Sequence, residues 1–292
     1  MNQGDLEGYW GPVTSSIDWC ERNYVVNPYL AEFWNSVSNI VIVLVGLWNL
    51  RASYKQRYEP RYALLSLGVA VVGVGSFAFH GTLLFSSQIA DEVPMIYSIL
   101  IWNYCLYHIE SVEKKHWQSL RASQVIMVIA SLGYTVVHIR YALVTSFQLY
   151  FAFLVVTGVV LLVKQSMIHT TYSFFPFISS FYRPPRPHHA TLKSPHTDSL
   201  RTLIRLYFLF LLSGVVVWII DQNYCTALYN LPFGLPNPQL HAWWHALTGY
   251  SHHVGIQFVI GVRQKFFTGR LPVTVWHGGV FPVTTAAGKE NK

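Results

Sequence analysis

The sequence His241-Ala-Trp-Trp-His245 lies near the start of the last apolar segment of the chain. Two histidines four residues apart lie one above the other on one face of a helix, so both imidazoles can reach a single metal ion. A catalytic zinc site takes three protein ligands and a water, so this pair leaves one ligand to be found elsewhere. Packing with a hydrogen bond is the alternative. The position in an apolar segment favours function, because polar side chains are costly in a membrane.

The composition points to a membrane protein. Of the 292 residues, 52% are hydrophobic and only 11% are charged, whereas soluble proteins carry about 25% charged residues. Aromatic residues make up 16% of the chain, as expected for aromatic belts at both membrane faces. The net charge is +7, and the basic residues lie in short loops between apolar runs. Membrane topology explains this charge better than nucleic-acid binding does, and no obligate protein partner is evident.

Seven segments are apolar enough, and roughly long enough, to cross the ~30 Å hydrocarbon core as helices. They span residues 33–50, 62–82, 91–109, 122–140, 144–166, 202–220 and 239–262. The third segment begins with Asp91, Glu92 and Pro94, and the seventh holds the histidine pair. The sequence therefore predicts an all-α seven-helix bundle over residues 33–262, with its site on these two polar segments. Residues 1–32 precede the bundle, and residues 263–292 form a tail that we expect to be disordered.

Basic residues set the expected orientation, because cytosolic loops carry an excess of Lys and Arg. One side of the predicted membrane holds Arg51, Lys55, Arg57, Arg61, Lys114, Lys115, Arg121, Lys164, Arg183, Arg186, Lys193, Arg201, Arg205, Arg263, Lys265, Arg270, Lys289 and Lys292. The other side holds only Arg22 and Arg140. The N-terminus is therefore predicted in the lumen and the C-terminus in the cytosol. The Pro- and His-rich connection at about 170–198 is predicted to be cytosolic.

This orientation brings three stretches to a similar depth. The second segment ends near His80 on the lumenal side, the third starts there with Asp91, and the seventh starts there with His241 and His245. His80 is thus the leading third ligand. Ser76 precedes His80 by four residues and faces the same way, although helix packing is an alternative role for this serine.

Three neutral imidazoles with one open position form a hydrolytic zinc centre, which acidifies a bound water and polarises a carbonyl. Asp91 is placed to act as general acid and base, and Ser76 to hydrogen-bond a developing oxyanion. Capping of the third segment is the alternative for Asp91 and Glu92, because the helix dipole favours acids there. Of the two, we expect Glu92 to be the structural residue.

A second acidic cluster, Asp18, Glu21 and Asn23, precedes the first segment, with Glu32 beside its start. Carboxylate, amide and backbone oxygens suit calcium. The spacing is not that of an EF-hand, and an ordinary solvated acidic stretch is the alternative.

The three cysteines form no disulfide framework. Cys20 and Cys225 both fall on the predicted lumenal side, where an oxidising compartment permits them to pair. Cys105 lies within the third segment and is expected to be a buried thiol.

Five ordered motifs together resemble the alkaline ceramidases. They are Gly-Tyr-Trp-Gly-Pro-Val-Thr-Ser-Ser-Ile-Asp-Trp-Cys-Glu (8–21), Ala-Glu-Phe-Trp-Asn (31–35), Gly-Ser-Phe-Ala-Phe-His (75–80), Asp-Glu-Val-Pro-Met-Ile-Tyr (91–97) and His-Ala-Trp-Trp-His-Ala-Leu-Thr-Gly (241–249). The resemblance covers about residues 8–262 and is strongest to the fungal and phytoceramide-cleaving branch. After His80 the chain departs from the family pattern, which leaves the substrate preference open.

The resemblance implies a multi-pass amidase of the endoplasmic reticulum or Golgi membrane. Its substrate would be ceramide or phytoceramide entering laterally from the bilayer, and its products a sphingoid base and a free fatty acid. Carried over to this chain, the zinc ligands are His80, His241 and His245, with Asp91 as acid/base and Ser76 at the oxyanion. The calcium ligands are Asp18, the carbonyl of Trp19, Glu21, Asn23 and Glu32, and the lumenal disulfide joins Cys20 to Cys225.

Two other classes of protein compete with this interpretation. Seven-helix receptors of the progestin and adiponectin type also bind zinc through histidines inside the bundle, but their N-terminus is cytosolic. A haem protein would place axial histidines on facing helices and would have no use for Asp91 or Ser76. His252 and His253, further along the last segment, are expected not to be ligands.

Overall fold

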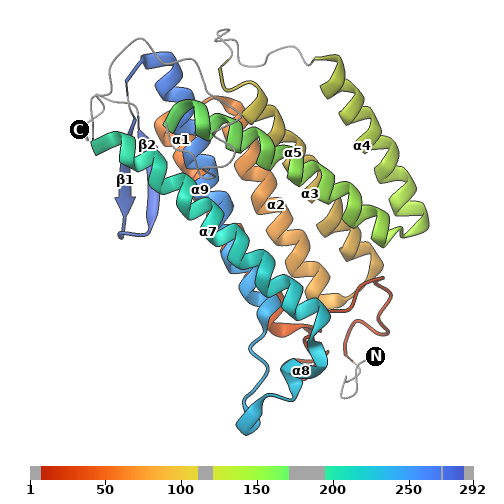
Figure 1. The fold of residues 1–292 in the computed structure, drawn as a ribbon. Helices are drawn as coiled ribbons and strands as arrows, with labels where there is room; N and C mark the ends of the chain where they lie inside the picture. Colours follow the sequence, from red (N-terminus) through yellow and green to blue (C-terminus); the bar gives the residue numbers. More distant parts are fainter. Residues whose placement is uncertain (1–7, 111–120, 171–194, 271, 286–292) are drawn as a thin grey trace.

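The computed structural model describes residues 8–110, 121–170, 195–270 and 272–285, and long helices dominate it (Figure 1). The long helices are α1 (Phe33–Gln56), α2 (Pro60–Thr82), α3 (Phe85–Tyr107), α4 (Ala122–Tyr141), α5 (Val144–Thr170), α7 (Pro195–Asn223) and α9 (Leu240–Thr268). The short helix α8 (Cys225–Tyr229) and the 3-10 turn η1 (Pro232–Gly234) connect α7 to α9. Two strands, β1 (Val273–His277) and β2 (Phe281–Thr285), follow α9.

Five of the described helices are long and apolar enough to cross a membrane: α1, α2, α4, α5 and the Ser199–Asn223 part of α7. A helix rises ~1.5 Å per residue, so 20 residues cover the ~30 Å hydrocarbon core. Leu149, Phe153 and Val160 on α5 are among the large apolar side chains left exposed, as a lipid-facing surface requires. The prediction of an α-helical membrane protein is confirmed. The other two long helices, α3 and α9, carry the polar residues described below.

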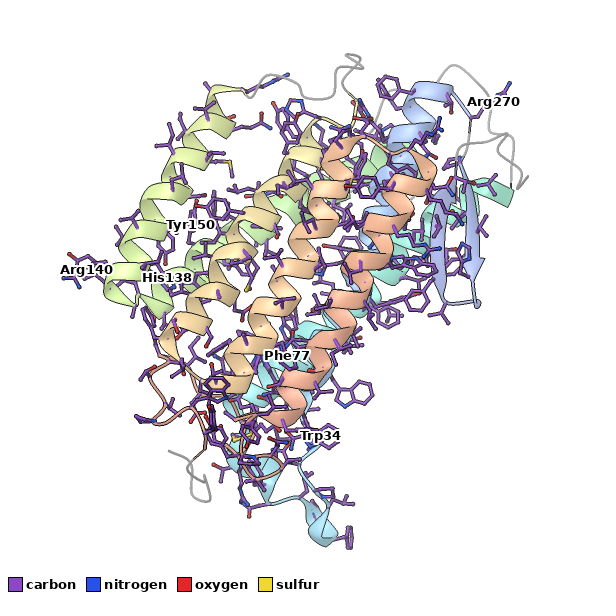
Figure 2. All side chains as sticks on the ribbon, turned by 180° about the vertical axis from the view of Figure 1, so that it is seen from behind. Trp34, Phe77, His138, Arg140, Tyr150 and Arg270 are labelled. Carbon is purple, nitrogen blue, oxygen red and sulfur yellow. A yellow bond between two sulfur atoms is a disulfide. The ribbon has the colours of Figure 1, made fainter. Side chains whose placement is uncertain are left out.

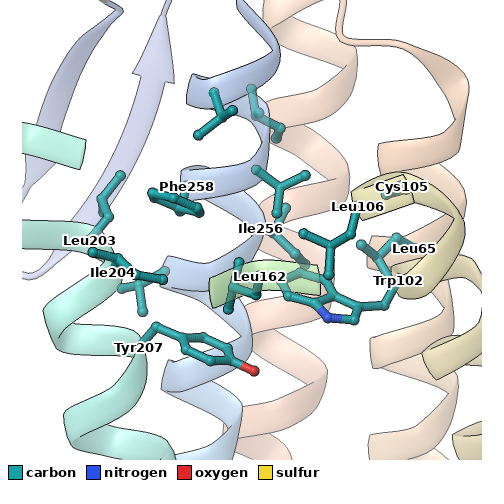
Figure 3. Packing of buried hydrophobic residues seen from close by; sticks show 14 of the residues in the cluster. Leu65, Trp102, Cys105, Leu106, Leu162, Leu203, Ile204, Tyr207, Ile256 and Phe258 are labelled. Atoms are coloured by element: carbon teal, nitrogen blue, oxygen red, sulfur yellow. The ribbon is translucent and has the colours of Figure 1, made fainter. Parts of the chain in front are cut away.

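The helices pack in sequence along one side, α1 on α2 and α2 on α3, while α9 lies between α1 and α7. Their shared core joins α2, α3, α5, α7 and α9 (Figure 3). Within it the ring of Trp102 on α3 stacks on Tyr207 of α7, with ring centroids 6.1 Å apart. The same cluster buries Leu162 and Phe258 completely. The free thiol of Cys105 also lies in this core, as predicted.

The bundle has two different ends (Figure 1). At one end, which we call the N-terminal end, lie the segment before α1, the start of α9 and helix α8. Figure 2 shows Trp34 at this end and Arg270 at the opposite end. At the opposite end the buried Arg61 and Arg263 both pair with Glu59, at 2.8 and 2.7 Å. This ion-pair cluster ties the end of α9 to the start of α2.

The tail after α9, expected to be disordered, instead includes a two-stranded antiparallel hairpin over Val273–Thr285. Gly278 and Gly279 adopt positive φ angles of 60° and 72° in its turn, a conformation that favours glycine. The backbone N–H of Thr284 donates to Gln257 on α9 at 2.8 Å. A β-branched run followed by Gly-Gly is a hairpin signature, and low hydropathy alone does not distinguish it from a disordered tail. Residues 171–194 of the predicted cytosolic loop and 286–292 of the tail lie outside the described residues.

Candidate metal centre

Three buried histidines converge at the N-terminal end of the bundle. His80 lies in the last turn of α2, and His241 and His245 lie in the first turns of α9. One ring nitrogen of each lies within 4.8 Å of those of the other two, and the side chains are 1–3% exposed. Among the described residues, only this group of three His, Cys, Asp or Glu side chains meets that distance. Three converging imidazoles suit zinc, whose sites commonly use histidine nitrogens.

The partners of two ring nitrogens show which edges of the rings face the centre. His80 Nδ1 lies 2.5 Å from Glu32 Oε2, and His245 Nδ1 lies 2.8 Å from Ser38 Oγ. Each ring therefore has Nε2 left for a metal. Metal-bound histidines usually donate their second N–H to such a partner, which fixes the tautomer and the ring orientation. The arrangement of His80 and His245 is thus that of ligating histidines.

Ser76 on α2 and Asp91 on α3 form a hydrogen-bonded pair near this end of the two helices. Both are buried, and the Ser76 side chain hydrogen-bonds to the Asp91 side chain across the α2–α3 contact. Ser76 lies one helical turn before His80, so the serine and the histidine share one side of α2, and Asp91 bonds to the serine from α3. The pair offers a proton-transfer group and a hydroxyl donor close in sequence to a candidate ligand.

The contact between α2 and α3 that sets this pair depends on Gly75. A Cβ atom at Gly75 would lie 2.1 Å from the Ala90 carbonyl oxygen and 3.0 Å from the Asp91 Cα. No such carbon fits without moving α3 away from α2. Glycine here therefore places Asp91 as well as allowing the two helices to pack closely.

Gly75→Ala is expected to destabilise the protein by about 1–3 kcal/mol, because the added methyl group overpacks the contact. It should also lower turnover by shifting Asp91. Gly133→Ala on α4 is the matched control, since a Cβ there meets no atom within 4 Å. Thermal melting of both purified variants measures the effect. Equal melting temperatures would contradict the role given to Gly75.

Glu92 has a structural role, but not the expected one. Helix α3 begins at Phe85 rather than near residue 91 and has no acidic residue in its first turn. Glu92 therefore does not cap it: its Oε2 lies 2.5 Å from Nε2 of His138 on α4, and its Oε1 accepts from Gln88 at 3.0 Å. The polar segment Ser86-Ser87-Gln88 is typical of a loop in sequence, but it forms the first turn of α3. His138 was missed because its partner lies on another helix.

The acidic residues of the N-terminal segment also gather at this end. Glu21 accepts the backbone N–H groups of Trp34 and Asn35, both at 2.8 Å, at the start of α1. Glu32 accepts the backbone N–H of Trp19 at 2.9 Å through the oxygen that does not face His80. Asn23 donates to Asp18 at 3.2 Å.

Burial raises the pKa of Glu21 to about 7, with the nearby Glu32 carboxylate adding to the rise and backbone hydrogen bonds opposing it. A cation bound among these oxygens would favour the ionised form of Glu21. Of the four side chains predicted to bind calcium, Asp18 is thus linked to Asn23 by a hydrogen bond, and Glu21 lies near Glu32.

The disulfide between Cys20 and Cys225 is confirmed. It joins the N-terminal segment to the start of α8, next to the end of α7. The neighbouring Trp19 stacks on the ring of His241, with centroids 3.8 Å apart and an interplanar angle of 27°. A cavity of about 120 Å³ lies beside this stack and is lined by Ile17, Asp18, Trp19, Cys20, Asp221, Gln222 and Cys225. The N-terminal segment thus covers one face of the histidine cluster.

His252 and His253 make contacts that do not involve the centre. His252 Nδ1 bonds to the carbonyl of Thr248 at 2.6 Å, and His253 Nδ1 lies 3.0 Å from Asn49 Oδ1. Neither belongs to the three-histidine group. This is the arrangement expected of histidines that are not ligands.

Fold and site together define a helical membrane protein with a buried three-histidine centre. Its sequence matches the Ceramidase family over residues 11–284. It is 33% identical to mouse alkaline ceramidase 3 over 95% of this chain and 94% of the relative. Identity to the alkaline ceramidase YPC1 of Saccharomyces cerevisiae is 30%, over 99% of this chain and 89% of the relative. An alkaline ceramidase of Arabidopsis thaliana is 26% identical over 91% of this chain and 94% of its own length.

The chain belongs to the ceramidase family. It is an enzyme, an amide hydrolase of the alkaline ceramidase type, as the motif resemblance predicted. The receptor interpretation gains no support from these relatives.

Proposed function

We propose that this chain hydrolyses the N-acyl amide of ceramide or phytoceramide, giving a sphingoid base and a free fatty acid. The observation that carries the proposal is the buried cluster of His80, His241 and His245 in a bundle of membrane-spanning length. Ser76, hydrogen-bonded to Asp91, lies one helical turn before His80 on α2. Relatives with ceramidase activity in their names cover nearly the whole chain. A ceramide keeps both chains in the bilayer, so we infer that it enters laterally between helices and meets the site at headgroup depth.

His80, His241 and His245 would hold a zinc ion through Nε2. Zinc in such a site supplies Lewis-acid polarisation of an amide carbonyl and acidification of water. Asp91 takes the proton from the attacking water, and the water oxygen forms the new C–O bond. Ser76 donates its hydroxyl hydrogen to the oxyanion that develops on the amide oxygen. Asp91 then passes its proton to the nitrogen as the C–N bond breaks, so the sphingoid base leaves as a neutral amine. The buried surroundings exclude bulk water, which strengthens each of these interactions.

Hydrolysis of long-chain ceramide and phytoceramide by the detergent-purified protein tests the proposal. Mass spectrometry should find sphingoid base and fatty acid in equal amounts. Protein that binds zinc but cleaves neither lipid would favour the receptor-like interpretation.

Seven spans with a lumenal N-terminus form part of the proposal, in the endoplasmic reticulum or Golgi membrane. The excess of basic residues at the opposite end of the bundle supports this orientation. A glycosylation acceptor placed before residue 8 should be modified in microsomes, and one placed after residue 285 should not. Modification of the C-terminal site alone would reverse the orientation.

We further propose that Asp18, the carbonyl of Trp19, Glu21, Asn23 and Glu32 bind calcium. The buried carboxylates of Glu21 and Glu32 lie close enough to repel one another, and a divalent cation would relieve that repulsion. Glu32 contacts both Trp19 and His80. It therefore provides a direct route by which calcium would influence the position of His80.

Asp18→Ala is expected to remove most of the rise in melting temperature that calcium gives the wild-type protein, because one charged ligand is lost. Glu110→Gln is the control, since Glu110 pairs with His169 away from this cluster. Melting curves with calcium and with a calcium chelator measure the effect. An unchanged calcium response in Asp18→Ala would rule out this site.

A further inference from the structure

The three histidines of the centre differ in how their outer ring nitrogens are held. Glu32 holds Nδ1 of His80, and Ser38 holds Nδ1 of His245. The Nδ1 atom of His241 is buried and has no hydrogen-bond partner among the described residues. An unpaired buried nitrogen is costly, and ligating histidines almost always have an outer partner. His241 therefore lacks the one contact that the other two ligands have.

Asp221, at the end of α7, is fixed beside His241. Its side chain is buried, and its Oδ1 accepts the backbone N–H of His241 at 3.2 Å. The same side chain accepts the backbone N–H of Cys20. Its other oxygen, Oδ2, is buried and has no partner among the described residues. A buried, unpartnered carboxylate oxygen thus belongs to the side chain that already binds the backbone of His241.

The start of α9 explains why an acid from another helix is needed there. Gln239, the residue that precedes the helix, adopts a left-handed conformation and makes no side-chain cap. The first N–H groups of a helix have no partner within it, and that of His241 is one of them. Asp221 supplies the missing acceptor from α7. Asp221 is not among the site residues predicted from the sequence, although an acidic residue at the end of an apolar helix is a functional candidate.

We propose that Asp221 positions the third metal ligand: its Oδ2 accepts the Nδ1–H of His241 when the centre holds its metal. This inference rests on the proposed zinc centre. Trp19 restrains one face of the His241 ring by stacking on it, and Asp221 restrains its outer edge. The stack holds the plane of the ring, and the acceptor at Nδ1 fixes the tautomer that leaves Nε2 free for the metal. Each of the three ligands then has a dedicated outer partner, namely Glu32, Ser38 and Asp221.

The variant Asp221→Asn distinguishes a hydrogen bond to the His241 ring from simple capping of α9. The carboxylate only accepts, so it can serve the backbone N–H groups and the ring N–H together. Asn has a single acceptor oxygen and an N–H2 group of similar shape. It can keep the bond to the His241 backbone but then presents a donor to the ring nitrogen. Asp221→Glu keeps two acceptor oxygens and is the conservative comparison.

The test is the zinc affinity of the full-length protein in detergent, measured by competition with a chromogenic chelator. Asp221→Asn is expected to weaken zinc binding by about 10–100-fold, the usual cost of losing an outer partner. Asp221→Glu should bind at least about fivefold more tightly than Asp221→Asn, because the acceptor is retained. Gln222→Ala, the next residue along the same cavity, should bind zinc as the wild type does. The absorption bands of the cobalt-substituted protein should change in Asp221→Asn alone.

Melting of the metal-free proteins separates a folding defect from a loss of affinity. If Asp221→Asn does not fold, Asp221→Ala takes its place in the comparison with Asp221→Glu. Zinc affinity of Asp221→Asn within threefold of wild type, or equal to that of Asp221→Glu, would overturn the inference. Such an unchanged zinc affinity is expected if Asp221 only caps the start of α9, or if its free oxygen accepts the indole N–H of Trp19 instead of the His241 ring. A wild-type protein without zinc affinity would overturn the proposed function itself, and this inference with it.

Discussion

Asp91→Asn is expected to reduce the turnover number by about 10²–10⁴-fold, the usual contribution of a general acid–base group. The amide that replaces the carboxylate cannot take a proton from water or return one to the leaving amine. It can still accept a hydrogen bond from Ser76, so the helix contact should persist. Steady-state hydrolysis measures the loss, and metal analysis of the same samples should find the zinc content unchanged.

Glu92→Gln is the matched control for Asp91→Asn. Glu92 is the next residue, is also buried, and bonds to His138 rather than to Ser76. The variant Glu92→Gln should lower the melting temperature while leaving turnover within about tenfold of wild type, because the general acid–base group Asp91 is retained. Undiminished activity in Asp91→Asn would remove Asp91 from the mechanism. Comparable losses in both variants would mean that the charge of the region matters, not the acid itself.

His241→Ala is expected to abolish both zinc binding and hydrolysis. It removes one of three protein ligands, so the loss of zinc affinity should exceed the ~10–100-fold that an outer partner contributes. It also removes the ring on which Trp19 stacks, so the cover over the centre should loosen. Metal content and hydrolysis measured on one preparation show whether the two properties fall together.

His252→Ala provides a comparison on the same helix. His252 bonds to the carbonyl of Thr248 in the preceding turn and lies outside the three-histidine group, so its loss should change neither zinc content nor hydrolysis. Zinc retained at the wild-type level in His241→Ala would exclude His241 as a ligand. Zinc lost in His252→Ala would mean that the ion is held further along α9.

The three histidines could be predicted from the sequence because each carries a local signal. The spacing of His241 and His245 puts both on one helix face, and counting apolar segments assigns His80 to the same depth. Pairing between helices carries no such signal. Asp221, Ser38 and His138 belong to no spaced motif, and nothing in the sequence around them identifies their partners. Only the packed bundle brings Asp221 to the backbone of His241.

The helices themselves were predictable and their starts were less so. Long apolar runs predict α1, α2, α4, α5 and α7, because an apolar segment in lipid must satisfy its own backbone hydrogen bonds and a helix does so. The start of α3 was predicted too late, because the polar stretch before Asp91 resembles a loop. In the structure Gln88 from that stretch accepts the backbone N–H of Ser16 at 2.8 Å and donates to Glu92. A polar turn of helix is stable there because its partners come from the N-terminal segment.

Zinc content measured together with ceramide hydrolysis in one preparation of wild-type protein tests the central claim most directly. We expect about one zinc ion per chain and cleavage of the amide. We also expect both to be lost when zinc is removed by a strong chelator and restored when zinc alone is added back. Hydrolysis that continues in protein shown to hold no zinc or other transition metal would contradict the claim that His80, His241 and His245 form a catalytic metal centre.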